Sequence, residues 1–530
     1  MTKRALPRLP RAYRMYLALK VTFCVQVYGA IWLRRYFPVN FFLTIFFTSL
    51  GIAVMGYHSG LEDDGIYLSA IQADLNPSLY PHDAAFFQLQ MRTSIFPNMM
   101  AHFVGVTGMP LAWSELLWQL ISIFLIIWGC WSIVSRLFEE STARWAGVAM
   151  VAAMFTLPVT GTALLIVDQY LHPRVMAMAL IMLAVSRILA GKSWQAVPLL
   201  ALGFLIHPLM GALGITFCCI LALTCFEPFR ARLRILRKRL GSYAATSAAA
   251  FIPLGWVFAT PSKTWLEITR SRHCLHLYQW TWYEWLGVIG PLVLFWLLWR
   301  IARKRGEIAL ARFAIAVVIY CVFQQAVAMV TLSPLAPAGL SALEPMRYLH
   351  LVYIFMALIG GAFLGKYLLK ASVWRWAVFL VVINGSMFAA QRLQYSSSEH
   401  LELPGLASAN PWLQAFSWIC QNTPTDAYFA LDPEYLAAPE EDYHSFRAQA
   451  ERSQLADNIK DTSVATLVPE LDEAWKRQTE AQKGWSHFQL ADFERLKAEF
   501  GVDWVLVSFP QPVGLNCEWH NESLSVCQIP

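Results

Sequence analysis

The sequence predicts a mainly α-helical protein that crosses a membrane about eleven times and ends in a small soluble α/β domain. Of its 530 residues, 57% are hydrophobic and only 14% are charged, well below the quarter or so that soluble domains carry. Apolar segments near the spanning length of about 20 residues recur along residues 40–396. From residue 397 onward, the composition becomes that of an ordinary soluble domain.

Residues 1–39 form a strongly basic N-terminus. They contain eight Lys and Arg residues and no Asp or Glu, which is too basic and too long for the start of a secretory signal peptide. We expect this segment to lie in the cytoplasm. Within it, residues 13–33 are apolar but carry Lys20 and are flanked by arginines, so we expect an interfacial helix here and not a span.

Candidate membrane spans fill most of residues 40–396. The longest apolar segment is interrupted at Pro208, which breaks the helical hydrogen-bond pattern and divides the segment into two crossings. The candidates are residues 40–57, 112–137, 143–166, 174–190, 194–227 (two crossings), 241–260, 284–301, 308–330, 347–366 and 375–392.

Basic residues predict the orientation of these spans. They gather in four loops that this span count puts on one side, and basic loops favour the cytoplasm. The loops contain residues 34–35, 230–239, 300–305 and 366–375. The opposite, external side then receives the first long loop (58–111), the turn at 168–174, residues 261–283, residues 331–346 and the C-terminal tail.

Residues 397–530 (the tail) are predicted to be a soluble α/β domain. The tail holds 21 of the 35 acidic residues but only 8 of the 41 basic ones, which gives it a formal charge of −13 against +19 for the rest. Cys517 and Cys527 flank a hairpin pattern and could form a disulfide, which suits an oxidising compartment. Helix patterns cover 411–421, 468–481 and 490–500, and strand patterns cover "YFAL" and "VDWVLV".

The first external loop opens on three consecutive acids, in "HSGLEDDGIYLSAI" (58–71). Asp63 or Asp64 could cap a helix that begins near Gly65. Capping accounts for one acid only, and neighbouring carboxylates repel unless a metal, a cation or a proton compensates. Because ionisable groups at membrane depth are usually functional, we favour a functional site that includes Glu62, Asp63 and Asp64. The helix itself would lie on the membrane with an apolar stripe formed by Leu68, Ile71 and Leu75.

Two further external segments carry cations. The turn "DQYLHPR" contains Asp168, His172 and Arg174, and "EPMRYLH" contains Glu344, Arg347 and His350. Arginine suits phosphate oxygens because its guanidinium is a planar fork of donors. The alternatives are an ion pair between Arg174 and Asp168, and, for Arg347, a pair with Glu344 or contact with lipid headgroups.

The order of these features resembles the GT-C superfamily of membrane glycosyltransferases. A first span is followed by an external loop that opens on "EDD", then by many spans and an external soluble domain; "EDDGIYLSAI", "LYPHDAAFF" and "NTPTDAYFALDPE" are similar to bacterial members. The resemblance implies a GT-C-like fold and inverting sugar transfer from a polyprenyl-phosphate donor to a glycan, lipid or protein acceptor. It also implies a bacterial inner membrane with the tail in the periplasm.

The resemblance assigns roles to residues of this chain. Asp63 or Asp64, with Glu62 as neighbour, would deprotonate the acceptor hydroxyl or hold a divalent cation, Mg²⁺ or Mn²⁺, and Asp63 and Asp64 would be its ligands. The candidate substrate-binding residues are Asp168, His172, Arg174, Arg347, His350 and Tyr67.

Other functions are less well supported. The sequence has no dinucleotide-binding, Walker, HExxH or GxSxG motif, which argues against hydride transfer, ATP hydrolysis and zinc proteolysis. Nucleic acid is not expected as a partner, because the positive-inside rule already explains the basic loops. A transporter remains an alternative, although transporters usually keep charges near the midplane and show repeats. A non-catalytic envelope assembly protein is the other alternative. Convergence of the acids and arginines on one cavity would favour transfer chemistry.

Overall fold

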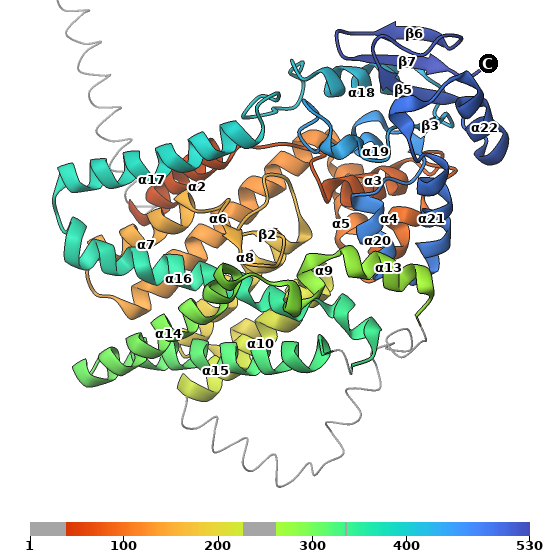
Figure 1. Ribbon diagram of the computed structural model, residues 1–530. Coiled ribbons are helices and arrows are strands. Elements are labelled where there is room, and N and C mark those ends of the chain that lie inside the picture. Colours follow the sequence, from red (N-terminus) through yellow and green to blue (C-terminus); the bar gives the residue numbers. More distant parts are fainter. Residues whose placement is uncertain (1–38, 226–260, 334–335) are drawn as a thin grey trace, which may run out of the picture.

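The computed structural model describes residues 39–225, 261–333 and 336–530. It shows a helical bundle with a small mixed α/β domain at one end (Figure 1). The predicted fold class, mainly α-helical with a small α/β tail, is confirmed. The predicted interfacial helix at 13–33 and the candidate span at 241–260 lie outside the described residues.

Helices occupy most of the predicted spans in the described part of the chain. In the described part of the chain, six helical segments are long and apolar enough to cross a membrane: α6 (Leu111–Leu137), α10 (Pro208–Cys225), α14 (Trp282–Arg305), α15 (Ile308–Thr331), Gly339–Leu369, which contains α16 (Leu349–Leu364), and α17 (Val373–Gln394). Shorter helices fill other predicted spans: α2 (Val39–Met55), α7 (Ser141–Ala153), α8 (Pro173–Leu189) and α9 (Ala196–Ile206). The break at Pro208 is confirmed, because α9 ends and α10 begins there.

The predicted span at 143–166 is wrong in its second half. Helix α7 ends at Ala153, and the chain then forms a hairpin of β1 (Pro158–Val159) and β2 (Leu164–Leu165). Gly161 in the turn has a φ of +60°, which glycine adopts without strain. Its Cα lies so close to the Trp280 ring that a Cβ would clash with it.

The first long loop (58–111) folds into α3 (Asp64–Leu75), α4 (Ala85–Met91) and α5 (Phe96–Thr107). The prediction that α3 lies on the membrane is wrong, because every residue from Asp64 to Ala73 is buried. Helix α3 packs against α5 and against α19 (Phe446–Ala450) of the tail. Burial on all sides is why its polar and apolar positions show no clean stripe.

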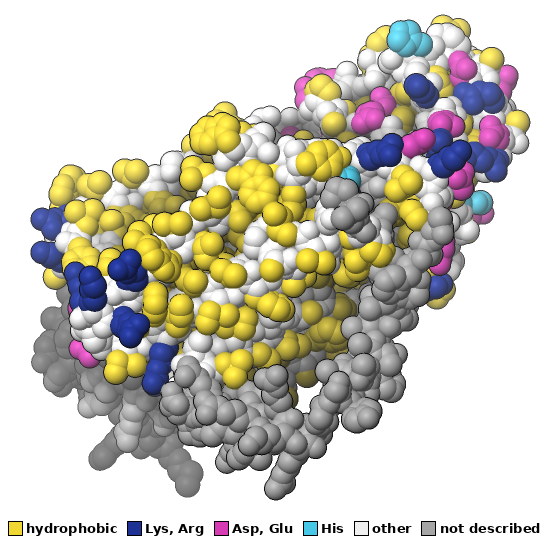
Figure 2. All heavy atoms as spheres, turned by 60° about the horizontal axis from the view of Figure 1, so that its bottom comes forward, with side chains coloured by type: hydrophobic (Ala, Val, Ile, Leu, Met, Phe, Trp, Pro, Cys, Tyr) yellow, Lys and Arg dark blue, Asp and Glu magenta, His cyan; other side chains and the backbone are white. Residues whose placement is uncertain are grey.

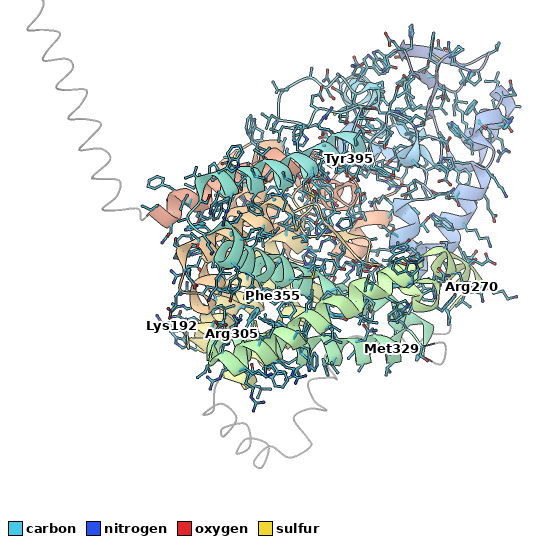
Figure 3. All side chains as sticks on the ribbon, turned by 60° about the vertical axis from the view of Figure 1, so that its left-hand side comes forward. Lys192, Arg270, Arg305, Met329, Phe355 and Tyr395 are labelled. Atoms are coloured by element: carbon cyan, nitrogen blue, oxygen red, sulfur yellow. A yellow bond between two sulfur atoms is a disulfide. The ribbon has the colours of Figure 1, made fainter. Side chains whose placement is uncertain are left out.

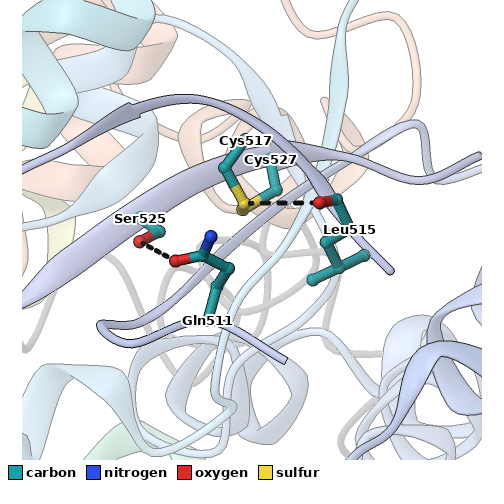
Figure 4. The surroundings of a disulfide bond; sticks show 5 residues. All are labelled: Gln511, Leu515, Cys517, Ser525 and Cys527. Atoms are coloured by element: carbon teal, nitrogen blue, oxygen red, sulfur yellow. Dashed lines mark hydrogen bonds between the residues drawn. A yellow bond between two sulfur atoms is a disulfide. The ribbon is translucent and has the colours of Figure 1, made fainter. Parts of the chain in front are cut away.

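The tail contains a five-stranded sheet in the order β4-β3-β5-β7-β6. Its strands are β3 (Tyr428–Ala430), β4 (Ser453–Gln454), β5 (Trp504–Ser508), β6 (Asn516–His520) and β7 (Leu524–Gln528), and its main helices are α18 (Pro411–Asn422), α20 (Lys460–Leu467), α21 (Asp472–Ala481) and α22 (Leu490–Phe500). Strand β3 pairs in parallel with β4 and β5, whereas β7 is antiparallel to β5 and β6. A disulfide joins Cys517 of β6 to Cys527 of β7, its registered partner (Figure 4).

The tail is packed directly onto the first external loop. Leu401 forms a parallel β-bridge with Tyr57, and His444 forms an antiparallel bridge with Leu61. The buried Arg447 guanidinium binds the carboxylates of Asp83 in the loop and Asp461 in α20. Beyond the loop, the tail also contacts α13 (Lys263–Ser271) through α20 and α21.

Hydrophobic side chains cover a broad face of the bundle (Figure 2). Basic side chains cluster at one end of this face, and the mixed charges of the tail lie at the other. Lys192 and Arg305 also lie at the end of the bundle opposite Arg270 (Figure 3). This distribution is that of a multi-pass membrane protein. Exposed apolar residues on the lipid-facing helices include Ile289, Leu294, Ile319, Val322, Val381 and Val382.

Candidate active site

The acids of the first loop line two adjoining cavities. The first cavity measures about 350 Å³, and its wall includes Tyr67, His172 and Arg347. The second measures about 950 Å³, and its wall includes Asp168 and Arg174. The two cavities share Glu62, Asp63, Ala163, Leu164, Arg272 and Ser463. Asp63 therefore shares the first cavity with Arg347 and the second with Arg174, the two arginines predicted from the sequence. Asp64 and His350 line neither cavity.

Lys460 of the tail supplies the positive charge that faces the acids. Its Nζ lies 3.0 Å from Asp63 Oδ1 and 3.3 Å from Glu62 Oε2. Glu62 itself has a left-handed backbone, with a φ of +48°, and its N–H donates to Tyr443 O. No local pattern predicts this contact, because Lys460 lies at the start of a tail helix almost 400 residues away.

Asp63 is held in its ionised form. Burial opposes ionisation, but the Lys460 ammonium and the neighbouring His172 outweigh it and hold the pKa of Asp63 well below its usual range. The predicted helix cap has the expected position but lacks the expected hydrogen bond. Asp63 occupies the N-cap position of α3, yet its side chain makes no capping hydrogen bond, because it turns toward Lys460.

His172 presents an N–H to Asp63. Its Nδ1 accepts a hydrogen bond from the Arg174 N–H at 2.9 Å and caps α8, so the proton of the neutral ring lies on Nε2. Nε2 is 3.7 Å from Asp63 Oδ2, which is too long for a hydrogen bond but short enough for attraction. Burial and the nearby Arg174 guanidinium lower the pKa of His172, which keeps the ring neutral. The ring also packs edge-on against Tyr67.

Asp64 has a different environment from Asp63. Its carboxylate accepts the Gly60 N–H at 2.7 Å, and its side chain is buried. Burial and the nearby Glu115 carboxyl raise the pKa of Asp64 well above its usual range. Glu115 in turn accepts a hydrogen bond from the Ser59 hydroxyl at 2.9 Å. The surroundings therefore favour the protonated form of Asp64 and the ionised form of Asp63.

Two arginines flank one carboxylate in the first cavity. Arg347 forms an ion pair with Glu344, and Arg272 Nη2 lies 3.8 Å from the other Glu344 oxygen. Arg347 Nε is buried and has no hydrogen-bond partner in the part of the chain that the structure describes. The cavity wall thus holds more donor capacity than Glu344 uses. Arg347 therefore forms the ion pair with Glu344 that was one of the predicted alternatives, and it also lines the first cavity.

Arg174 and His350 form hydrogen bonds with other residues of the chain. Arg174 binds Asp168 through two bonds, Nη2 to Oδ1 at 2.6 Å and Nε to Oδ2 at 3.2 Å. Burial opposes ionisation of Asp168, but Arg174 lowers its pKa below the usual value. His350 Nε2 lies 2.9 Å from Ile166 O, and this histidine lies behind the cavities.

Metal-ligating groups converge elsewhere. Among the residues that the structure describes, three ligating side chains come together at one place, formed by His58, Glu402 and His444. Asp63 and Asp64 are not part of it, and the Asp63 carboxylate already faces an ammonium. The divalent cation expected at Asp63 and Asp64 stays a prediction.

Comparisons with known proteins add a likeness to solved structures. The sequence matches no protein-family model and no curated protein. Among solved structures, the chain is similar to the archaeal oligosaccharyltransferase AglB from Archaeoglobus fulgidus, solved with an inhibitory peptide and a dolichol-phosphate. The sequence identity is 10% and the TM-score 0.44, over 90% of this chain and 70% of the other. At that similarity, conclusions about function depend on the site itself.

Proposed function

We propose that the protein is an integral membrane glycosyltransferase. It would move a sugar from a polyprenyl-phosphate donor to an acceptor hydroxyl at the external face of a bacterial inner membrane, with the tail in the periplasm. The observation that supports this proposal best is the position of Asp63. It is an ionised carboxylate at the junction of two cavities, and in the first of them Arg272 and Arg347 flank the Glu344 carboxylate.

Asp63 suits the role of general base. An acceptor hydroxyl is a weak nucleophile, and a positioned carboxylate takes its proton as oxygen attacks the anomeric carbon. The bond from that carbon to the phosphate oxygen breaks on the opposite face, so the configuration inverts. Lys460 and His172 keep Asp63 ionised. His172 has its Nε2–H directed at the same carboxylate and would orient it.

The first cavity suits the leaving phosphate. Negative charge builds on the phosphate oxygens as the sugar leaves, and fixed cationic donors stabilise such charge. Arg272 and Arg347 can offer the donors that Glu344 does not use. The second cavity, which is the larger, would then receive the acceptor beside Asp63.

A matched pair of variants tests this proposal. Purified protein is incubated with a panel of polyprenyl-phosphate sugars and candidate acceptors, and sugar transfer is measured for wild type, Asp63→Asn and Asp64→Asn. We expect Asp63→Asn to lose about 10²–10⁴-fold in kcat. Asp64→Asn should retain most activity, because Asp64 lines neither cavity and an amide oxygen can still accept the Gly60 N–H. Full activity of Asp63→Asn would remove the base from the mechanism.

The same assay tests the expected metal. Transfer measured in EDTA, and again after addition of Mg²⁺ or Mn²⁺, shows whether a divalent cation takes part. A cation held by Asp63 and Asp64 would have to displace Lys460 from Asp63. Full transfer in EDTA would assign the charge compensation to Lys460 instead.

A further inference from the structure

Three ligating side chains meet where the tail joins the end of α2, outside the two cavities. His58 follows the first span, whereas Glu402 and His444 belong to the tail. Their ligating atoms all lie within 4.8 Å of one another. Both histidines are fully buried, and the Glu402 side chain is only 11% exposed. A buried charge needs a compensating partner, so the groups around Glu402 decide what this cluster can hold.

The hydrogen bonds of His444 fix its orientation. Its Nδ1 lies 2.9 Å from the carbonyl oxygen of Glu441. Because a carbonyl can only accept, Nδ1 carries a proton. In the neutral ring, Nε2 then directs a lone pair at the Glu402 carboxylate, whose oxygens lie 2.9 and 3.1 Å away. Two acceptors at that distance repel each other unless a proton or a metal ion lies between them.

The arrangement matches that of a metal-bound histidine. Such a histidine usually donates its second N–H to a carbonyl or carboxylate, as His444 does to Glu441. His58 approaches the same Glu402 carboxylate, with its Nδ1 2.8 Å from Oε1. In a tetrahedral zinc site with bonds of about 2.0–2.1 Å, ligand atoms stand about 3.3 Å apart. The two contacts with Glu402, at 2.8 and 2.9 Å, would therefore have to lengthen by only about 0.5 Å. The two imidazole nitrogens, which lie within 4.8 Å of each other, would likewise have to stand about 3.3 Å apart.

We propose that His58, Glu402 and His444 bind a Zn²⁺ ion. Two imidazoles and one carboxylate are a common zinc ligand set, and imidazole nitrogen favours zinc over Mg²⁺ or Ca²⁺. The ion would join the first external loop to the tail. His58 lies five residues before Asp63, and His444 lies three residues before Arg447. The site would thus help to fix the segment that carries Asp63 against the domain that carries Lys460.

Metal content tests the proposal directly and does not depend on any enzymatic activity. Full-length protein carrying a histidine-free affinity tag is purified in detergent, dialysed against Zn²⁺ and then against buffer, and analysed by mass spectrometry for metals. We expect about one zinc ion per chain. Glu402→Gln and His444→Gln should each lower zinc retention at least about tenfold, because each removes one ligand.

A neighbouring histidine gives the matched control. His400 lies in the same junction, with its Nε2 2.9 Å from Ala53 O, and is not part of the cluster. His400→Gln should keep its zinc. Wild-type protein loaded with Co²⁺ should show the visible absorption of a tetrahedral cobalt site. This measurement uses wild-type protein alone and therefore does not depend on whether the variants fold.

The proposal is overturned by either of two results. One is wild-type protein that retains less than about a tenth of a zinc ion per chain and shows no cobalt absorption. The other is unchanged zinc retention in both ligand variants, provided that they elute as wild type does in size-exclusion chromatography. In the first case, a proton lies between His444 and Glu402, and the cluster is an imidazolium–carboxylate pair.

Discussion

Replacing Lys460 by methionine tests whether the tail sets the charge state of the candidate base. The substitution keeps most of the side-chain volume but removes the ammonium that lies 3.0 Å from Asp63 and 3.3 Å from Glu62. Two neighbouring carboxylates are then left without their nearest cation. Because Lys460 is the largest favourable influence on the ionised form of Asp63, we expect the pKa of Asp63 to rise.

The size of the effect follows from the geometry. Two unit charges 4 Å apart attract by about 4 kcal/mol at an effective dielectric constant of about 20. Direct contact with an opposite charge usually shifts the titration of a carboxyl by about 1–3 pH units. His172 and Arg174 still favour the ionised form in the variant, so the change stays within that range. The acidic limb of the activity profile should therefore move upward by about 1–3 pH units.

The direction in which the acidic limb of the activity profile moves follows from the protonation state that a general base requires. A general base works only when ionised, so activity falls as the pH drops through the pKa of Asp63 in the folded protein. In wild type, this pKa is lowered and the fall occurs well below neutral pH. In Lys460→Met, the fall should begin closer to neutral pH. The measurement is the transfer rate between pH 4 and 8 for both proteins.

Lys476 provides the matched control. Its Nζ lies 3.0 Å from Glu267 Oε2, so it also joins the tail to the rest of the chain through an ion pair, but it lines neither cavity. Lys476→Met should leave the profile unchanged. An acidic limb that coincides in Lys460→Met, Lys476→Met and wild type would refute the electrostatic role of Lys460.

Three further predictions concern stability and can be measured by thermal unfolding. Arg447→Met should destabilise the protein by about 3–5 kcal/mol, because it leaves Asp83 and Asp461 buried without their partner. The control is Arg477→Met, which removes an exposed ion pair with Glu499 and should cost at most about 1 kcal/mol. Burial and the neighbouring Asp461 raise the pKa of Asp457 to about 7, so the folded chain holds a proton that the unfolded chain releases near pH 4, and stability falls as the pH rises from about 4 to about 7. Asp457→Asn keeps an acceptor for the Ile459 N–H and should reduce this fall; an unchanged pH dependence would contradict the shift. Replacing Cys517 and Cys527 by serine should cost about 2–4 kcal/mol, since their disulfide closes a short loop, and an unchanged unfolding temperature would contradict this estimate.

Local patterns predicted much of the fold. Apolar length located most of the described span helices, and Pro208 marked the division between α9 and α10. In the tail, the hairpin was recognisable because turn residues separate two short segments that carry Cys517 and Cys527. The end of α7 at Ala153 was missed because residues 154–166 are as apolar as a span, although they form a buried hairpin.

The candidate site was only partly predictable. The unusual "EDD" sequence identified Asp63, and the external segments "DQYLHPR" and "EPMRYLH" identified Arg174 and Arg347. Long-range contacts were not predictable, because Lys460 lies in an ordinary helix of the tail and no local pattern relates it to the first loop. The different roles of Asp63 and Asp64 were also hidden, since they depend on which neighbour each carboxyl meets after folding.

The charges of the three consecutive acids Glu62, Asp63 and Asp64 are compensated in two different ways. Asp63 and Glu62 face the Lys460 ammonium, whereas burial and the neighbouring Glu115 raise the pKa of Asp64. A soluble domain that merely covered the cavities would not need to contribute a buried cation to them. Because Lys460 lines the first cavity and lowers the pKa of Asp63, the tail is part of the candidate site. Lys460 also lies in α20 beside Asp461, to which Arg447 binds, and Arg447 binds Asp83 of the first loop as well. The same contacts that hold the tail in place therefore position the charge that Asp63 requires.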